Sequence, residues 1–272
     1  MSLSERERIR IADLASAKQR GERFAMLTAY EQYAAQIFDE AGIDVLLVGD
    51  SAANNVYGHD NSLPVTLDEL LPLSRAVVKS VRRPLVVVDL PFGSYEASPA
   101  MAVQSSVRVL KEGLAHAVKI EGGAYYADHV HAVVNAGIPV MAHIGFTPQS
   151  EHVLSGYRVQ GRGEDATRLI EDAKALEEGG AFCVLMEMVP AETAAAVDAA
   201  VKVPTIGIGA GPSTTGQVLV WQDMAGLRGG QGQHVAKFVK QYADLRNELL
   251  NAARLFGEDV RKGTFPSAEQ SF

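Results

Sequence analysis

The sequence predicts a (βα)8 barrel formed as one domain by residues 1–272. Three observations predict it: short apolar runs recur eight times, helix-like segments separate them, and glycine ends several of those segments. The runs are mostly continuous rather than alternating with polar residues, which is typical of strands buried on both faces of a parallel sheet. Eight such units within roughly 250 residues fit this barrel. A doubly wound open sheet is the alternative.

The expected elements follow in chain order. A helix begins near Ile9 and precedes the first strand. The strands are expected at Phe24–Leu27, Val45–Val48, Leu85–Val88, Ala117–Ile120, Val140–Ala142, Phe182–Met186, Thr205–Ile208 and Gln217–Val220. Helices are expected at Tyr30–Ala41, after Thr66, at Met101–Glu112, His129–Ala136 and Asp165–Glu178, and as a charged amphipathic helix at Phe238–Phe256 before a short polar tail. Thr66 and Glu69 form a capping box, and Gly42, Gly113, Gly137 and Gly179 are expected C-caps.

The composition is that of a soluble globular protein. Of 272 residues, 47% are hydrophobic and 21% charged, so a large core can form. The net charge of −8 argues against a nucleic-acid or anionic-membrane partner. No apolar run nears the length of a membrane span, and MSLSERERIRI lacks the apolar segment of a secretory signal. With one cysteine, Cys183, no intrachain disulfide can form, and we expect a cytoplasmic protein.

Charged side chains follow the apolar runs at the ends where this fold places its active sites. Four carboxylates, a lysine and a histidine share that rim, and crowded carboxylates repel one another unless a cation or protons compensate. A hard cation such as Mg2+ takes one or two carboxylates directly. Asp50 and Asp89 suit that role, and Glu121 suits a direct or water-mediated one. The six residues are Asp50, Asp89, Lys119, Glu121, His143 and Glu187.

Other candidate features have competing interpretations. His129 and His131 point to different sides of their expected helix, so metal chelation is not expected. Cys183 lies within an apolar strand and is expected to be a core thiol. The glycines of Gly207–Gly211 could approach a cofactor phosphate or a substrate closely. The loop Ser155–Gly163 is either a solvated connection or a mobile lid whose arginines meet an anionic substrate group.

Seven strings at the strand ends occur together in order. They are LLVGDS at 46–51, LPVT at 63–66, VDLPF at 88–92, VKIEGG at 118–123, HIGFTPQ at 143–149, GYRVQGRG at 156–163 and IGIGAG at 206–211. On these strings the sequence resembles the ketopantoate hydroxymethyltransferase family over essentially its whole length. The segment FVKQYADL at 238–245 also resembles that family, whereas Ser155 stands where the family usually has glycine.

The resemblance implies a barrel of the phosphoenolpyruvate-mutase-like superfamily, dependence on Mg2+, and a homo-oligomer, possibly a decamer. It implies transfer of a hydroxymethyl group from 5,10-methylenetetrahydrofolate to 3-methyl-2-oxobutanoate, giving 2-dehydropantoate, the first committed step of pantothenate biosynthesis. By motif, Asp50 and Asp89 would bind the metal and border the substrate, and Glu121 would complete the metal site. Ser51 and Lys119 would contact substrate, and Glu187 would be the general base, with His143 as the second candidate.

The residues leave three alternatives open. Another Mg-dependent 2-oxo acid carbon–carbon lyase of the same superfamily would typically carry a cysteine on a catalytic loop, whereas Cys183 lies in an expected core strand. Lys119 could form a Schiff base as in metal-free aldolases. A binding protein without catalysis would have no need of a free carboxylate such as Glu187, whose pKa we expect burial and like charge to raise modestly.

Overall fold

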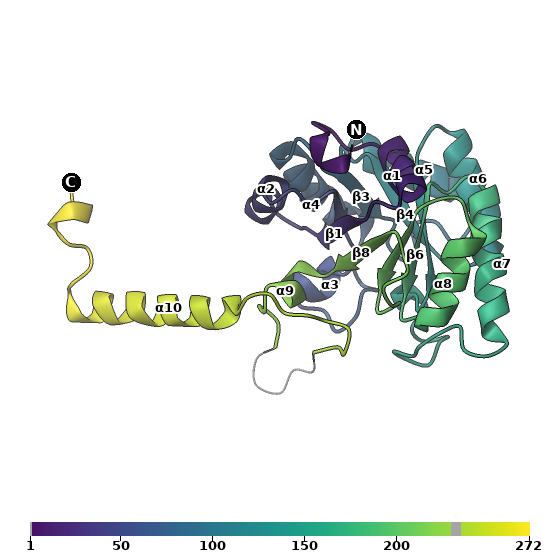
Figure 1. Ribbon diagram of the computed structural model, residues 1–272. Helices are drawn as coiled ribbons and strands as arrows, with labels where there is room; N and C mark the ends of the chain where they lie inside the picture. The colour runs from purple at the N-terminus through teal and green to yellow at the C-terminus, as the bar shows by residue number, and fades with distance from the viewer. Residues whose placement is uncertain (1, 230–234) are drawn as a thin grey trace. The chain divides into compact units, whose positions relative to one another are not determined.

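Eight parallel strands close into a barrel in the computed structural model, which describes residues 2–229 and 235–272 (Figure 1). Each strand pairs with the next, and the last pairs with the first, so the sheet has no free edge. The predicted barrel is therefore confirmed, and the open sheet is wrong. The strands are β1 (Phe24–Thr28), β2 (Val45–Val48), β3 (Leu85–Asp89), β4 (Ala117–Glu121), β5 (Val140–Gly145), β6 (Cys183–Glu187), β7 (Thr205–Ile208) and β8 (Gly216–Leu219).

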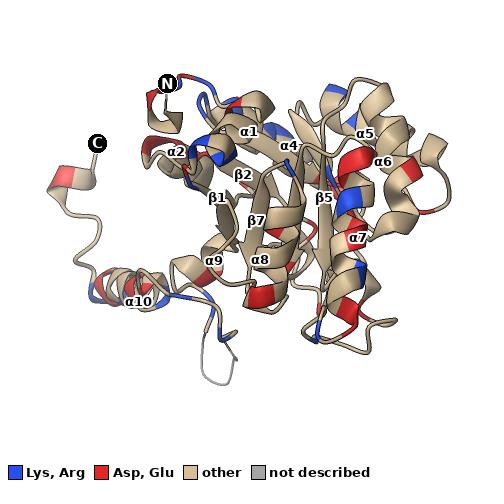
Figure 2. Cartoon of the chain, turned by 45° about the vertical axis from the view of Figure 1, so that its right-hand side comes forward, with Lys and Arg blue, Asp and Glu red and all other residues tan. Residues whose placement is uncertain are grey.

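Helices connect most of the strands and carry many of the chain's charged residues (Figure 2). They are α1 (Ile11–Arg20), α2 (Gln32–Glu40), α3 (Ala52–Asn55), α4 (Leu67–Ser80), α5 (Pro99–Lys111), α6 (Ala127–Asn135), α7 (Asp165–Glu178) and α8 (Ala191–Ala200), with 3-10 turns at Leu3–Glu5, Ala124–Tyr126 and Pro148–Ser150. The capping box of Thr66 and Glu69 is confirmed, since each side chain accepts the other's backbone N–H. No described helix is long and apolar enough to cross a bilayer.

The connection between β7 and β8 departs from the expected repeat. Residues 209–215 form no helix, although a parallel crossover usually needs a dozen residues or more. The segment is too short for a helix that returns to the sheet, and Gly209 and Gly211 adopt positive φ angles of 61° and 75°. One of the eight expected strand–helix units is thus a tight loop.

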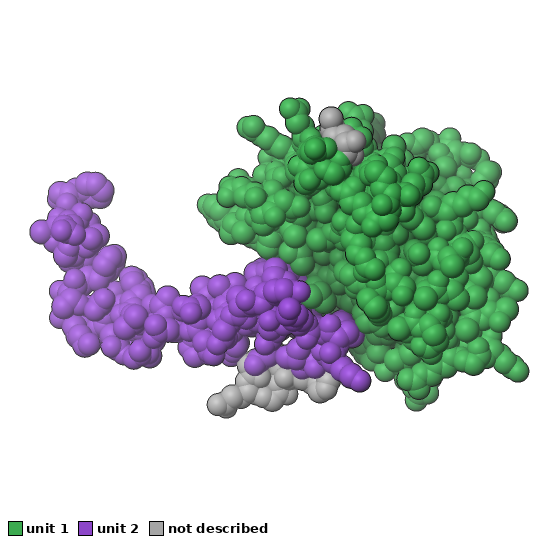
Figure 3. Space-filling view, viewed as in Figure 1, with its two compact units in different colours: residues 1–219 green, residues 220–272 purple. Residues whose placement is uncertain are grey.

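The chain divides into two compact units, Met1–Leu219 and Val220–Phe272, coloured separately in Figure 3. The first contains the whole barrel, and the second contains α9 (Trp221–Met224), α10 (Leu245–Lys262) and the 3-10 turn Ala268–Gln270. The single domain over 1–272 stays a prediction.

The bounds predicted for the C-terminal helix, Phe238–Phe256, are wrong. The helix begins at Leu245 because the backbone N–H groups of Tyr242 and Leu245 donate to the carbonyls of Met224 and Ala225 at 2.8 and 3.0 Å. It continues past Phe256 to Gly263, whose left-handed conformation ends it.

The core of the barrel follows from side-chain alternation along each strand. Every second residue points inward, and these inward residues are apolar at the start of the strands. At that end α1 and the segment before it add Leu3, Ile9, Leu14 and Ala17 to the same cluster. The inward strand residues of the cluster are Phe24, Met26, Val45, Leu47, Leu85, Val87, Ala117, Met141, Cys183, Leu185, Ile206 and Val218. The barrel is therefore a filled apolar core at its N-terminal end, and Cys183 is a core thiol as predicted.

Candidate active site

The same alternation carries polar side chains into the barrel at its C-terminal end. Asp89 follows Val87 on the inward face of β3, and Lys119 and Glu121 follow Ala117 on β4. His143 follows Met141, and Glu187 follows Leu185. The inward face thus changes from apolar to charged within two residues, and this change creates the site.

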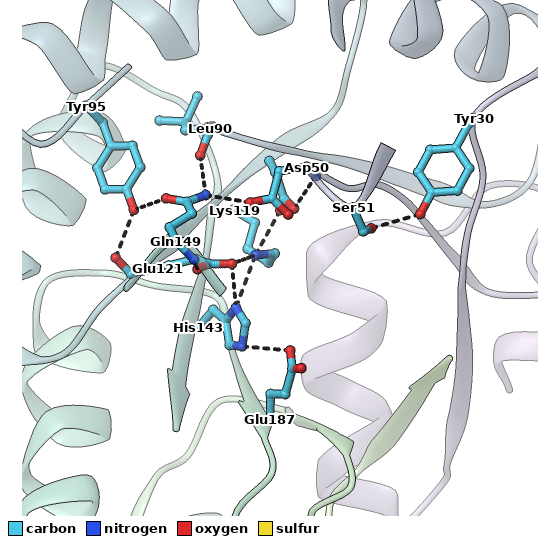
Figure 4. Close-up of polar contacts among 11 residues, drawn as sticks. Tyr30, Asp50, Ser51, Leu90, Tyr95, Lys119, Glu121, His143, Gln149 and Glu187 are labelled. Atoms are coloured by element: carbon cyan, nitrogen blue, oxygen red, sulfur yellow. Dashed lines mark hydrogen bonds and ion pairs between the residues drawn. The ribbon is translucent and has the colours of Figure 1, made fainter. Parts of the chain in front are cut away.

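Three carboxylates form a buried cluster at this end. One ligand oxygen each from Asp50, Asp89 and Glu121 lies within 4.8 Å of the other two. The backbone N–H of Asp50 donates to Asp89 Oδ2 at 2.9 Å, which draws the ends of β2 and β3 together. Lys119 Nζ lies 3.0 Å from Asp89 Oδ1. It also lies 3.0 Å from Glu121 Oε1 (Figure 4). The predicted placement of Lys119 and Glu121 on one inward face is confirmed.

Burial and mutual charge perturb the pKa values of this cluster. Burial, followed by the charges of Glu121 and Asp89, raises the pKa of Asp50 well above its usual value, and burial also raises the pKa of Asp89. Burial alone would raise the pKa of Glu121, but Lys119 and His143 outweigh it and lower that pKa to about 2. Burial opposes the charge on Lys119, yet the surrounding carboxylates raise its pKa. The cluster therefore contains one charged lysine, which does not neutralise the negative charge of the three carboxylates.

These residues fit a hard divalent cation. When all are ionised, the three carboxylates and the Lys119 ammonium leave two negative charges, which a divalent ion would cancel. Asp89 Oδ1 is buried and, beyond its ion pair with Lys119, accepts no hydrogen bond from the described residues. One lysine does not balance three buried carboxylates, so a further cation that binds them would relieve their mutual repulsion. Asp50, Asp89 and Glu121 could therefore hold Mg2+.

Glu187 stands apart from the three-carboxylate cluster and meets it through His143. His143 Nδ1 lies 3.0 Å from Glu121 Oε1 and 3.1 Å from Lys119 Nζ, and its Nε2 lies 3.5 Å from Glu187 Oε2. The last distance is too long for a strong hydrogen bond. Burial and then Lys119 lower the pKa of His143, so its ring is neutral near pH 7. Burial and then Glu121 raise the pKa of Glu187 to about 8, the direction expected from the sequence.

The backbone that carries Glu187 is held closely. A Cβ on Gly145 would lie 2.4 Å from the Glu187 carbonyl oxygen, and Gly145 has a φ of 91°. The Phe146 N–H donates to that same oxygen at 2.8 Å. Met188, the next residue, has a φ of 49°, a strained conformation for a side chain other than glycine. Close approach of β5 therefore fixes where β6 ends and where Glu187 emerges.

Ser51 lies at the N-terminus of α3, directly after Asp50. Its hydroxyl is 2.8 Å from the hydroxyl of the buried Tyr30. Burial raises the pKa of Tyr30 to about 12, so this phenol is protonated and can donate. Contact between Ser51 and a substrate stays a prediction.

The loop Ser155–Gly163 is attached to the protein next to Glu187. The Gln160 N–H donates to Met188 O at 3.0 Å, and Thr193 Oγ1 donates to Gly161 O at 2.8 Å. The Tyr157 ring packs on the buried Phe146 ring with 4.6 Å between centroids. The loop is therefore more than a solvated connection, and its closure as a lid stays a prediction.

Two glycines of Gly207–Gly211 are explained by protein contacts. A Cβ on Gly211 would lie 2.5 Å from Ala191 Cβ, and one on Gly207 would lie 3.0 Å from Thr214 Oγ1. Helix α8 and the β7–β8 loop therefore approach too closely for larger residues. A cofactor phosphate and a closely approaching substrate remain predictions for this segment.

His129 and His131 lie on α6, as expected, and have separate surroundings. The His129 ring packs against Tyr126, and His131 Nε2 lies 2.8 Å from Asn135 Nδ2. This arrangement agrees with the expectation that they do not chelate a metal together.

The sequence patterns do not single out three buried residues of the site, Gln149, Tyr95 and Tyr30. Gln149 lies inside the string HIGFTPQ, and Tyr95 follows the string VDLPF by three residues. The sequence feature that could have identified them is a polar residue close to the end of an expected strand. It was weak because exposed loops carry the same residue types, and only the fold shows that these three are buried.

Comparison with known proteins agrees with the strings at the strand ends. Residues 8–268 match the sequence model of the family described as ketopantoate hydroxymethyltransferase. The chain belongs to this family. A relative from Paenarthrobacter aurescens (strain TC1), named 3-methyl-2-oxobutanoate hydroxymethyltransferase, is 74% identical over 97% of this chain and 87% of its own length. A relative of the same name from Saccharopolyspora erythraea is 60% identical over 100% of this chain and 92% of its own.

Solved structures support the same fold at much lower identity. Phosphonopyruvate hydrolase matches with a TM-score of 0.60 at 15% identity, over 99% of this chain and 93% of that one. A 2,3-dimethylmalate lyase, described as a member of the PEP mutase/isocitrate lyase superfamily, gives 0.58 at 18% identity over 96% and 91%. The relatives that are 60–74% identical to this chain are named hydroxymethyltransferases. The alternative of a carbon–carbon lyase is therefore not favoured.

Proposed function

We propose that this chain transfers a hydroxymethyl group from 5,10-methylenetetrahydrofolate to 3-methyl-2-oxobutanoate, giving 2-dehydropantoate on the way to pantothenate. The observation that carries the proposal is the 74% identity, over 265 residues, to a relative named 3-methyl-2-oxobutanoate hydroxymethyltransferase. The geometry supports it because a cation site and a separate carboxylate, both needed for this chemistry, face the same end of the barrel.

The proposed cofactor is Mg2+, held by Asp50, Asp89 and Glu121. When bound, it would polarise the keto group of the 2-oxo acid and stabilise negative charge that develops on its oxygen. The two negative charges that Lys119 leaves uncompensated support a divalent ion at this position. Asp50 and Asp89 would also border the substrate.

Glu187 is the proposed general base. It lies outside the carboxylate cluster, so its oxygens are available for the proton at C3 of the substrate. A raised pKa brings a carboxylate nearer to the working pH, where a base transfers protons most effectively. His143 Nε2 lies 3.5 Å from Glu187 Oε2, so a small movement of either side chain would let the ring donate a hydrogen bond to this carboxylate.

Lys119 and Ser51 are the proposed substrate contacts. Lys119 keeps its charge because of Asp89 and Glu121, so its ammonium can steady the substrate carboxylate. A charged lysine is a poor nucleophile, which argues against the Schiff-base alternative.

A coupled assay tests the proposal. The purified chain is incubated with 3-methyl-2-oxobutanoate and 5,10-methylenetetrahydrofolate, with Mg2+ or with EDTA, and 2-dehydropantoate is measured. We expect product only with the folate and far more of it with Mg2+. Cleavage of 2-oxo acids without folate would instead support a lyase, and binding without exchange of the C3 proton would support a binding protein.

We further propose a homo-oligomer, with ten copies as the expected size. Helix α10 supports this, because none of its residues is buried and it exposes Leu249, Leu250, Leu255, Phe256 and Val260. Light scattering measures the copy number, and a monomer at micromolar concentration would contradict the proposal. The cytoplasm is the proposed location, in keeping with Cys183 being a buried free thiol.

A further inference from the structure

Gln149 is a buried polar residue that the proposed mechanism does not use. It lies in the 3-10 turn Pro148–Ser150 after β5, and only 6% of its surface is exposed. Its side-chain nitrogen donates to Asp50 Oδ2 and to the Leu90 carbonyl, each at 3.0 Å. Its backbone N–H donates to Glu121 Oε2 at 3.1 Å (Figure 4). One residue thus holds two of the three clustered carboxylates.

The orientation of the Gln149 amide is determined by its neighbours. The Leu90 carbonyl can only accept a hydrogen bond, and so can Asp50 when ionised, so the amide nitrogen must face them. The amide oxygen then faces the hydroxyl of Tyr95, which donates to it at 2.7 Å. The same hydroxyl lies 3.0 Å from the carbonyl oxygen of Glu121. Tyr95 is buried, and burial raises its pKa well above the usual value, so it remains a donor.

This arrangement suits a residue that supports ligands without being one. The amide oxygen faces Tyr95, and an N–H group cannot ligate a cation. Gln149 binds only Oδ2 of Asp50 and leaves Oδ1 for another partner, and it binds Oε2 of Glu121, whose Oε1 faces Lys119 and His143. A neutral donor also steadies Asp50 without competing for the charge that a cation would balance, whereas a second lysine would compete.

We propose that Gln149, oriented by Tyr95, is a positioning residue for the cation site, which fixes the Asp50 carboxylate with Oδ1 left for the ion and holds the Glu121 carboxylate beside it. The inference rests on the proposed Mg2+ site. Gln149 connects the turn after β5 to the ends of β2, β3 and β4, so one residue holds ligands that come from separate strands. Partners of this kind typically change metal affinity by about 10–100-fold.

Gln149→Met is the test, because methionine nearly keeps the volume and loses the side-chain N–H donors to Asp50 and Leu90, while the backbone N–H still donates to Glu121. Titration calorimetry with MgCl2 alone should show at least tenfold weaker binding than in the wild type. Activity should require more Mg2+ and recover to within a fewfold of the wild-type kcat at saturating Mg2+, because the role proposed for Gln149 is to place the metal ligands Asp50 and Glu121. Gln104→Met on the exposed face of α5 is the matched control and should change neither value.

Tyr95→Phe provides a second, milder variant, since it keeps Gln149 and releases its amide oxygen. We expect a fewfold loss of Mg2+ affinity. If folded Gln149→Met binds Mg2+ within twofold of the wild type, the inference is wrong. If Gln149→Met does not fold, unchanged affinity in Tyr95→Phe overturns the inference just as well. A wild type that binds no Mg2+ would overturn the cation site itself, and the two failures are therefore distinguishable.

Discussion

Replacing Glu187 by glutamine should inactivate the protein and stabilise its metal-free form. Glutamine keeps the shape of the side chain but can neither accept the C3 proton nor carry charge. Because Glu187 is outside the cluster of Asp50, Asp89 and Glu121, binding of Mg2+ and 3-methyl-2-oxobutanoate should persist. Loss of one general base should lower the rate of C3 proton exchange by about 10²–10⁴-fold.

The stability change follows from the raised pKa of Glu187. In the folded protein the pKa of Glu187 is raised to about 8, against an ordinary value of 4.5 for a glutamate side chain. The wild type therefore loses stability as pH rises from about 4.5, and the loss is complete above about 8. At 1.36 kcal/mol per pKa unit, the cost is at most about 5 kcal/mol. Glutamine has no proton to lose, so the variant should gain up to that amount at pH 9 and little at pH 4.

Deuterium exchange at C3, followed by proton NMR in deuterated buffer with Mg2+, measures the rate. Urea unfolding in EDTA at pH 4 and pH 9 measures the stability. Glu171→Gln, on the exposed face of α7, is the matched control and should change neither quantity. Exchange at the wild-type rate in Glu187→Gln would refute the assignment of the base and make His143 the next candidate. Equal stability at pH 9 would refute the raised pKa.

Four further substitutions test other parts of the chain. Asp50→Ala and Asp89→Ala should each abolish turnover by weakening Mg2+ binding in calorimetry, and unchanged affinity in either would remove that residue from the ligands. Lys119→Ala should raise the Kd for 3-methyl-2-oxobutanoate while Mg2+ still binds; borohydride trapping at Lys119 would replace the proposed mechanism with a Schiff base. Ser155→Gly should stabilise the fold by about 1 kcal/mol in urea unfolding, because Ser155 has a φ of 59°; a less stable variant would show that the serine side chain matters more than its backbone strain.

The sequence predicted the barrel and the polar rim because both depend on short-range patterns. Continuous apolar runs identified the strands, and strand alternation placed Lys119 beside Glu121. The roles of Gln149 and Tyr95 could not be predicted, since their partners at Asp50 and Glu121 are brought close only by barrel closure. The late start of α10 was missed for a similar reason, because backbone bonds from Tyr242 and Leu245 to α9 override the helical pattern.

The inward face of β4 shows how such a chain can change over evolutionary time. Deleting one residue early in this strand would turn Lys119 and Glu121 outward and bring Val118 and Ile120 inward, because side chains alternate with a period of two. The deletion would therefore disrupt the packing of the apolar core and remove the charged side chains of the site at the same time. A substitution at Glu121 leaves Ala117 and the apolar base beneath it untouched. New reactions can therefore arise in this scaffold by exchange of single strand-end residues, while insertions and deletions are confined to the loops.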